Sequence, residues 1–315
     1  MNGARFSVCS PSRTPRLSSR GEMKRKFPLS LDKICPWEYN SFINIPERKL
    51  SYMKRKIGIN ADCIRGGFIF GDIKKLGDLG FSGFFINFVQ TSYGKCRDIG
   101  ESVGMTFDFI HAPFRGINDM WLEGDAYLPL FNRMRSCIDT AATHAIPMVI
   151  IHLSSGWEPP AVNELGFFRF DKLVEHAKGK GVTIAFENLR NVENVLAAME
   201  RYRDESCVKY CYDCGHEHCY TQNFDWIKTF GDKLACIHVH DNYGYTREGD
   251  PDLHLLPFDG NLDYADMVRR LDEVGYEGPI MLEVFNSSTP EYAAMDNDTF
   301  MAECLARAKK IADMG

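Results

Sequence analysis

Eight short apolar runs, each followed by a stretch with helical spacing, restrict the folds open to this chain. The runs lie at residues 56–60, 83–88, 105–110, 147–151, 182–186, 208–212, 234–239 and 279–282. Apolar runs of this length are typical of buried strands. Strands that alternate with helices pair in parallel, because a parallel neighbour is reached only by a crossover. Eight repeats over about 260 residues predict an α/β fold of the (β/α)8, or TIM, barrel type. An open doubly wound sheet is the alternative.

Helical stretches are expected between the runs, and one more is expected after the last run. They lie at residues 70–79, 96–103, 126–144, 167–180, 191–202, 224–230, 262–274 and 293–314. No Gly-x-Gly-x-x-Gly follows the first run, and no P-loop occurs anywhere in the chain. Dinucleotide or nucleotide binding of those two kinds is therefore not indicated.

Composition narrows the class of protein. Of the 315 residues, 44% are hydrophobic and 25% are charged, as in ordinary globular domains. The formal net charge of −6 gives no support for a broad nucleic-acid-binding surface. No run of about 18 apolar residues occurs, so no membrane span is expected. The 11 cysteines are odd in number and scattered, which favours reduced thiols and a cytoplasmic location.

The first 52 residues differ in kind from the rest. Residues 1–26 are rich in Ser, Pro and Arg and lack apolar periodicity, which predicts disorder. Residues 27–50 contain Trp37, Tyr39 and Phe42, so disorder is expected for only part of this segment. A short basic segment that precedes the first apolar run begins at Met53. We therefore expect an N-terminal extension at 1–52 and a single catalytic barrel domain at 53–315.

The apolar runs end in residues that bind metals or transfer protons. The residues at or just after these ends are His111, His152, Glu187, Asp213, His216, His238, His240, Asp241 and Glu283, and a loop adds Asp252 and His254. In a barrel, the carboxyl ends of all strands meet at one face. Six such ends in succession predict a divalent metal site. Mixed carboxylate and imidazole ligands without a thiolate suit Mn²⁺, Mg²⁺, Co²⁺ or Zn²⁺.

These motifs resemble those of a known superfamily. The matching motifs are Phe186-Glu-Asn-Leu189, Asp213-x-x-His216, His238-x-x-Asp241, Asp252-x-His254 and Glu283. They are similar to those of the xylose isomerase-like, or endonuclease IV-like, TIM-barrel superfamily, and the resemblance covers about residues 53–315. This superfamily includes sugar phosphate isomerases and epimerases.

The resemblance to the sugar isomerases and epimerases implies a set of site residues. It implies one divalent metal ion held by Glu187, Asp213, His238 and Glu283. His238 is preferred to His240 because the family's ligand lies three positions before an acidic residue, here Asp241. The same resemblance implies that His216 contacts a substrate oxygen. The remaining candidates for substrate binding are His240, His111 and His152.

The expected chemistry moves a proton on a carbon atom next to a carbonyl group. This step needs an electrophile on the oxygen, which a divalent metal supplies, and a base near the C–H bond. Glu187 and Glu283 are the catalytic candidates, because two carboxylates on opposite faces can remove and return a proton and so invert a stereocentre. We therefore expect a metal-dependent isomerase or epimerase of carbohydrate metabolism. It would act on a small sugar through an enediolate, with a homo-oligomer as one option.

The DNA-repair members of the same superfamily provide the alternative function. The resemblance to these apurinic/apyrimidinic endonucleases implies a trinuclear zinc site with nine ligands. Counterparts exist for all nine, and the additional metal candidates are His111, His152, His216, Asp252 and His254. Against this function, Leu-Arg-Asn-Val follows Glu187-Asn188 in place of the family's Gly-rich turn. No evident basic, aromatic loops are present to grip a duplex, so nucleic acid is the less favoured partner.

Overall fold

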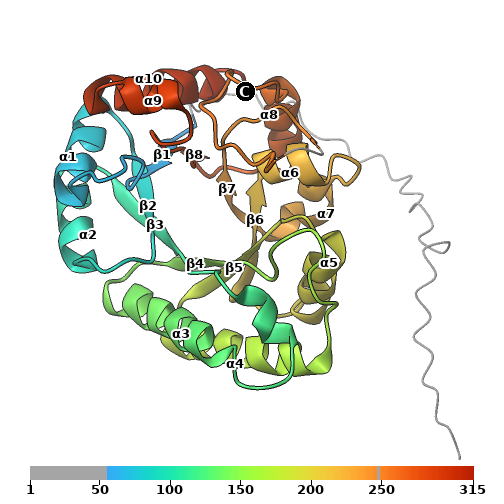
Figure 1. The fold of residues 1–315 in the computed structure, drawn as a ribbon. Helices are drawn as coiled ribbons and strands as arrows, with labels where there is room; N and C mark the ends of the chain where they lie inside the picture. Colours follow the sequence, from blue (N-terminus) through green and yellow to red (C-terminus); the bar gives the residue numbers. More distant parts are fainter. Residues whose placement is uncertain (1–54, 247–248) are drawn as a thin grey trace, which may run out of the picture. The chain divides into compact units, whose positions relative to one another are not determined.

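Eight parallel strands form a barrel in the computed structural model, which describes residues 55–246 and 249–315 (Figure 1). The strands are β1 (Ile57–Asn60), β2 (Gly83–Asn87), β3 (Thr106–His111), β4 (Met148–Ile151), β5 (Thr183–Glu187), β6 (Val208–Asp213), β7 (Leu234–His238) and β8 (Ile280–Leu282). Their order around the sheet is β7-β6-β5-β4-β3-β2-β1-β8, and each strand pairs with its neighbours in this order, so that β1 pairs with both β2 and β8.

The sheet closes where β7 meets β8. Beyond the end of β7, Val239 bridges Leu282, and its N–H donates to the Met281 carbonyl at 2.8 Å. The N–H of Glu283 donates to the Val239 carbonyl at 3.0 Å. This closure confirms the predicted (β/α)8 barrel and excludes the open doubly wound sheet. The closing bonds lie next to two residues predicted to bind metal, His238 and Glu283.

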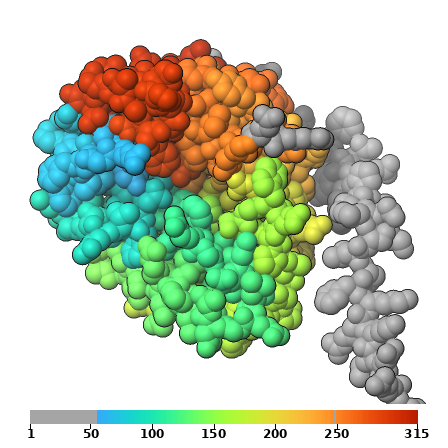
Figure 2. Space-filling view, in the orientation of Figure 1, coloured from blue at the N-terminus to red at the C-terminus, as the bar shows by residue number. Residues whose placement is uncertain are grey.

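Helices surround the barrel as a ring (Figure 1). They are α1 (Ile69–Leu79), α2 (Tyr93–Ser102), η2 (Ile117–Trp121), α3 (Leu128–Thr143), α4 (Glu164–Lys180), α5 (Val192–Arg201), α6 (Cys214–Tyr220), α7 (Trp226–Phe230), η3 (Gly231–Lys233), α8 (Tyr264–Glu273), α9 (Pro290–Ala294) and α10 (Asn297–Ala312). The first and last helices lie side by side, as Figure 2 shows, and Lys75 on α1 pairs with Asp298 on α10. The ring of helices thus closes like the strands inside it.

The prediction of a single helix at 293–314 is wrong in one respect. The structure has two helices there, α9 and α10, with a break at Met295 and Asp296. Asp296 caps α10 by accepting a hydrogen bond from the Thr299 N–H at 3.0 Å. Thr289 caps α9 in the same way, with Pro290 in the first turn. These are ordinary start signals, so they could have revealed the break.

The core has two layers because side chains alternate across each strand. The barrel interior holds Phe85, Phe109, Met148, Ile150, Ala185, Cys211, Cys236 and Met281. A larger apolar layer lies between the strands and the helices. Phe85 and Phe109 stack at 4.5 Å, and their rings lie 5.2 and 5.5 Å from that of His238. Each buried phenylalanine stabilises the fold by about 1.5–3 kcal/mol, and this pair also forms an apolar floor under the predicted site.

Three further expectations concern cysteines, membrane spans and the extension. The nine cysteines in the described part of the chain are free of disulfides. No helix among the described residues combines the length and apolar character needed to cross a membrane. The predicted extension at 1–52 lies outside the described residues.

Candidate metal centre

The carboxyl ends of β3 to β8 bring the predicted residues to one face of the barrel. His111, Glu187, Asp213 and His238 are the last residues of β3, β5, β6 and β7. His152 directly follows β4, and Glu283 directly follows β8. All six side chains are buried. The pattern of strand-ending polar residues therefore marked a real spatial cluster.

Glu187 lies at the centre of four imidazoles. Its Oε2 is 3.2 Å from His111 Nε2 and 3.1 Å from His152 Nε2. Its Oε1 is 3.1 Å from His216 Nδ1 and 3.4 Å from His238 Nδ1. Burial alone would raise the pKa of Glu187, but the surrounding imidazoles outweigh burial and hold it well below the usual value. Glu187 is therefore a carboxylate at neutral pH.

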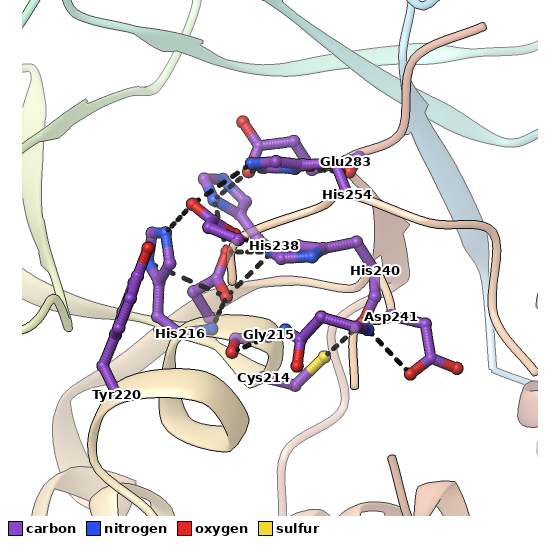
Figure 3. Close-up of polar contacts among 12 residues, drawn as sticks. Cys214, Gly215, His216, Tyr220, His238, His240, Asp241, His254 and Glu283 are labelled. Atoms are coloured by element: carbon purple, nitrogen blue, oxygen red, sulfur yellow. Dashed lines mark hydrogen bonds and ion pairs between the residues drawn. The ribbon is translucent and has the colours of Figure 1, made fainter. Parts of the chain in front are cut away.

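Four of the buried side chains converge as a candidate ligand set. Glu187, Asp213, His238 and Glu283 each offer one ligand atom, and these atoms all lie within 4.8 Å of one another. His238 Nδ1 lies 3.2 Å from Glu283 Oε2 and 3.7 Å from Asp213 Oδ2. Figure 3 shows His238 and Glu283 turned toward each other. This is the set that the sugar-enzyme resemblance implied.

The donor atoms of this set fit a divalent cation. Glu187 Oε1 and both ring nitrogens of His238 are buried without a hydrogen-bond partner among the described residues. Glu187 Oε1 and His238 Nδ1 lie 3.4 Å apart. A buried polar atom left unpaired costs about 1–3 kcal/mol, so a cation that satisfied Glu187 Oε1 and His238 Nδ1 together would stabilise the site. Carboxylate oxygens and imidazole nitrogens at this spacing suit a divalent metal ion.

A second group of ligand-type residues adjoins the first. Asp213, His216 and His240 form one set within 4.8 Å, and His240, His254 and Glu283 form another. His240 Nε2 is 3.1 Å from Asp213 Oδ1, and the rings of His240 and His254 stack at 4.0 Å. His240 Nδ1 is buried and has no hydrogen-bond partner in the described part of the chain. The structure thus places His240 among ligand atoms.

The loop residues Asp252 and His254 also reach this second group, as predicted. Asp252 Oδ2 is 3.0 Å from His216 Nε2 and 3.5 Å from His254 Nε2. Burial alone lowers the pKa of His254, but the Asp252 carboxylate outweighs burial and raises it to about 10. Burial would raise the pKa of Asp252, yet His254 and His216 hold it well below the usual value. Carboxylates and imidazoles therefore contact one another across the mouth of the barrel.

Asp241 is not part of this cluster, and its side chain turns away from it in Figure 3. Its Oδ2 accepts the Phe258 N–H at 2.9 Å, and its Oδ1 accepts the Leu262 N–H at 3.1 Å. Its backbone pairs with Leu255 through two hydrogen bonds of 2.9 Å. Asp241 therefore fixes the loop that carries Asp252 and His254.

Three asparagines that sequence reasoning missed hold the ligand-bearing backbone. The Asn188 side chain accepts the Asp213 N–H at 2.7 Å and donates to the Asp213 carbonyl at 2.8 Å. The Asn60 side chain likewise accepts the Val284 N–H at 3.0 Å and donates to the Val284 carbonyl at 2.9 Å, next to Glu283. Asn242 donates to the Gly215 carbonyl at 2.9 Å. Each amide extends the contact between neighbouring segments beyond the sheet. For Asn60 and Asn188 the available signal was an asparagine at, or directly after, a strand end.

Comparison with protein families gives one match that covers most of the chain. The model described as "Xylose isomerase-like TIM barrel" matches residues 74–304. The chain belongs to this family. This membership confirms the resemblance drawn from the motifs.

Two curated relatives carry no functional description in their names. Uncharacterized protein y4fM of Sinorhizobium fredii is 32% identical over 164 residues, which cover 48% of this chain and 51% of that protein. Uncharacterized protein MJ1311 of Methanocaldococcus jannaschii is 26% identical over 191 residues, which cover 55% of this chain and 63% of that protein.

Solved structures of the family share the fold at low sequence identity. D-psicose 3-epimerase with D-tagatose, from Clostridium cellulolyticum, aligns with a TM-score of 0.63 and 16% identity, over 80% of this chain and 96% of that one. The apo form of 3-keto-D-glucoside 4-epimerase, YcjR, from E. coli aligns with a TM-score of 0.61 and 15% identity, over 81% of this chain and 100% of that one. At such identities the similarity establishes the shared fold alone.

Proposed function

We propose that this family member is a divalent-metal-dependent isomerase or epimerase that acts on a small sugar or sugar phosphate. The observation that carries the proposal is the convergence of Glu187, Asp213, His238 and Glu283 at the carboxyl ends of β5 to β8. When bound there, a divalent metal supplies electrophilic stabilisation of the charge that develops on a substrate carbonyl oxygen. Mn²⁺, Mg²⁺, Co²⁺ and Zn²⁺ all accept this mixed ligand set.

Glu187 and Glu283 are proposed to transfer the proton. They extend from β5 and β8, which are separated by β6 and β7 on one side of the barrel, so they approach the axis from different directions. Burial opposes ionisation of both carboxyl groups, but neighbouring histidines outweigh it and lower both pKa values. Both groups are therefore ionised at neutral pH, and one carboxylate would take the proton from the substrate carbon to give an enediolate. The opposite group, after it takes a proton from water, would return a proton to the other face, and the first group would release its own proton to water.

The surrounding residues are suited to orient a sugar. His216 and His240 lie beside the ligand set, and in this proposal they contact substrate oxygens. His111 and His152 both contact Glu187 Oε2, which fixes the direction of that carboxylate. Phe114 stacks on His152 at 4.3 Å and remains 43% exposed. An exposed aromatic face beside buried polar groups suits the apolar face of a sugar.

The test combines metal analysis with isotope labelling. Purified protein is expected to hold about one divalent metal ion per chain, and metal-loaded protein is expected to interconvert ketoses or aldoses from a panel of sugars and sugar phosphates. Turnover in D₂O should place deuterium on the carbon next to the carbonyl, because a carboxylate exchanges its proton with water. Active enzyme that gives unlabelled product would contradict proton transfer and indicate a hydride shift instead.

A second candidate function is the metal-dependent cleavage of DNA at abasic sites. It is favoured by one observation, the overlapping sets that include His216, His240 and His254 beside the first ligand set. A multinuclear zinc site would use these residues. A duplex with a single abasic site distinguishes the two functions. Efficient incision together with three zinc ions per chain would favour the nuclease, whereas the sugar enzyme predicts neither result.

A further inference from the structure

An open cavity of about 390 Å³ lies between the loop after β1 and the loop after β8. It is lined by Arg65, Asn286, Ser287, Ser288, Thr289, Pro290 and Ala293. Its volume falls within the range of small-molecule sites in proteins. Both loops leave the carboxyl ends of their strands, so the cavity lies on the same face of the barrel as Glu187 and Glu283.

The lining of this cavity has the chemistry of an anion site. Arg65 is its one charged residue, and no carboxylate lines it. In the described part of the chain, the Arg65 guanidinium makes no ion pair or hydrogen bond, and neither does the Ser287 hydroxyl. Arg201 pairs with Asp171 and Arg270 pairs with Glu217, whereas Arg65, like the exposed Arg115, has no such partner among the described residues. An unpaired guanidinium beside hydroxyl donors suits an oxyanion.

Hydrogen bonds hold the two loops in place. The Arg65 N–H donates to Asn286 Oδ1 at 2.8 Å, and the Asn286 N–H donates to the Cys63 carbonyl at 2.9 Å. The Thr289 hydroxyl accepts the Tyr292 N–H at 3.2 Å. The cavity is therefore formed before any ligand arrives, which lowers the entropic cost of binding.

The same loop touches the metal centre. The Ser288 hydroxyl donates to the His254 carbonyl at 3.1 Å, and the Phe285 ring lies 5.5 Å from that of His254. Ser287 comes four residues after Glu283, so the two backbones are at most about 14 Å apart. One substrate molecule can therefore have its carbonyl group at Glu283 and its far end in the cavity.

We propose that the cavity binds the phosphate monoester of a phosphorylated sugar, with Arg65 and Ser287 as its principal contacts. The assignment of the reacting end rests on the function proposed above, whereas the anion site can be tested separately. A phosphate presents three oxygens in different directions and matches donors that surround it. A carboxylate is satisfied by the guanidinium alone and leaves the Ser287 hydroxyl without a partner.

The first test measures the binding of inorganic phosphate to the full-length protein loaded with Mn²⁺. Calorimetry gives the affinity, and paramagnetic broadening of the ³¹P resonance reports whether the bound phosphate lies near the metal. Arg65→Gln is expected to weaken binding about tenfold or more, because it removes charge-assisted hydrogen bonds. Ser287→Ala should weaken it by a smaller factor. Arg115→Gln is the matched control, because Arg115 is also exposed and follows a strand end at the same face.

The results separate this proposal from the proposed function. Phosphate binding that is unchanged in Arg65→Gln would overturn the anion site, even if the enzyme turns over sugars. Calorimetric binding that depends on Arg65 would support it, even if Mn²⁺ does not bind or no turnover is found. Stronger binding of acetate than of phosphate would overturn the choice of phosphate. In an active enzyme, Arg65→Gln should lower kcat/KM for the phosphorylated sugar and leave that for the unphosphorylated sugar unchanged.

Discussion

At the scale of single residues, the charge of the site depends on Glu187. One carboxylate contacts four imidazoles, and its replacement by an amide of the same shape removes the negative charge and keeps the packing. Glu187→Gln is expected to reduce bound metal from about one ion per chain to nearly none and to abolish turnover, with an unchanged far-UV circular dichroism spectrum. Glu158→Gln is the control, because this exposed glutamate lies in the loop after β4. Full metal occupancy in Glu187→Gln would contradict the ligand assignment.

Gly215 is required because of the ring of His240. A Cβ atom at this position would lie 2.0 Å from His240 Cε1 and 2.5 Å from both ring nitrogens. The ring cannot easily move, because it is buried and stacked on His254. Gly215→Ala is expected to lower the free energy of unfolding by about 1–3 kcal/mol and to weaken metal binding. Urea unfolding and metal titration check both effects.

Gly179→Ala provides the matched control for Gly215. Gly179 lies in α4, and a Cβ atom there meets nothing within 4 Å. This variant is expected to be stabilised by up to about 1 kcal/mol, because alanine favours the helix. If both variants behaved alike, contact with His240 would not be the reason for glycine at 215.

Asp108 on β3 links stability to pH away from the metal centre. Burial raises its pKa to about 6, although the Thr106 hydroxyl and Lys56 act in the opposite direction. Its Oδ2 is buried without a hydrogen-bond partner among the described residues. Because the folded pKa is raised above the unfolded value of about 4, ionisation destabilises the fold progressively as pH rises from about 4 to 6. Asp108→Asn should therefore raise the free energy of unfolding at pH 7.5 by on the order of 1–3 kcal/mol. At pH 4 the difference should vanish, and an equal gain at both pH values would contradict this explanation.

At the scale of elements, the strands were predictable because most are short apolar runs that the fold buries, although Asp108 interrupts β3 and Lys209 interrupts β6. The polar residue that ends each run then located the candidate ligands. Helix α6 was missed because it has only seven residues and begins directly after Asp213, which ends β6. The Asp213 carboxylate belongs to the candidate ligand set and also accepts the His216 N–H at 2.6 Å. One residue thus serves as both strand end and helix cap, and apolar spacing marks neither role.

The hydrogen bonds behind the ligands could not be predicted from sequence. Asn60 and Val284 are separated by 224 residues, and the partner of each asparagine is a backbone group that no residue type identifies. The same holds for Arg65, whose importance depends on a cavity formed with residues near the other end of the chain. The barrel topology predicts which side chains meet at the strand ends. Contacts between side chains and loops depend on loop conformations, which the sequence does not reveal.

The loop that carries Asp252 and His254 should depend on Asp241. Asp241→Ala removes the acceptor for the Phe258 and Leu262 N–H groups, which costs about 1–3 kcal/mol where they remain buried. We expect faster amide exchange and faster proteolysis across residues 252–262. Asp252→Asn is the comparison, because it removes a carboxylate of the centre and retains the anchor of the loop. Equal loop protection in wild type and Asp241→Ala would refute the anchoring role.

At the scale of the whole molecule, the barrel concentrates charged groups at its mouth, next to its closing seam. The Val239–Leu282 bridge lies between the ends that carry His238 and Glu283, so a metal ion held by both would join β7 to β8. A ligand that binds only the folded state stabilises it by about 2.7 kcal/mol at a hundred times its Kd. For a domain of this size that corresponds to a rise in Tm of about 5–10 °C. Dialysis against a chelator should therefore lower Tm by this amount, and saturating Mn²⁺ or Co²⁺ should restore it. Glu187→Gln should show no metal-dependent shift, because its ligand set is incomplete. A wild-type Tm that does not respond to metal, or a full shift retained in Glu187→Gln, would mean that the cluster at the barrel mouth is not the binding site.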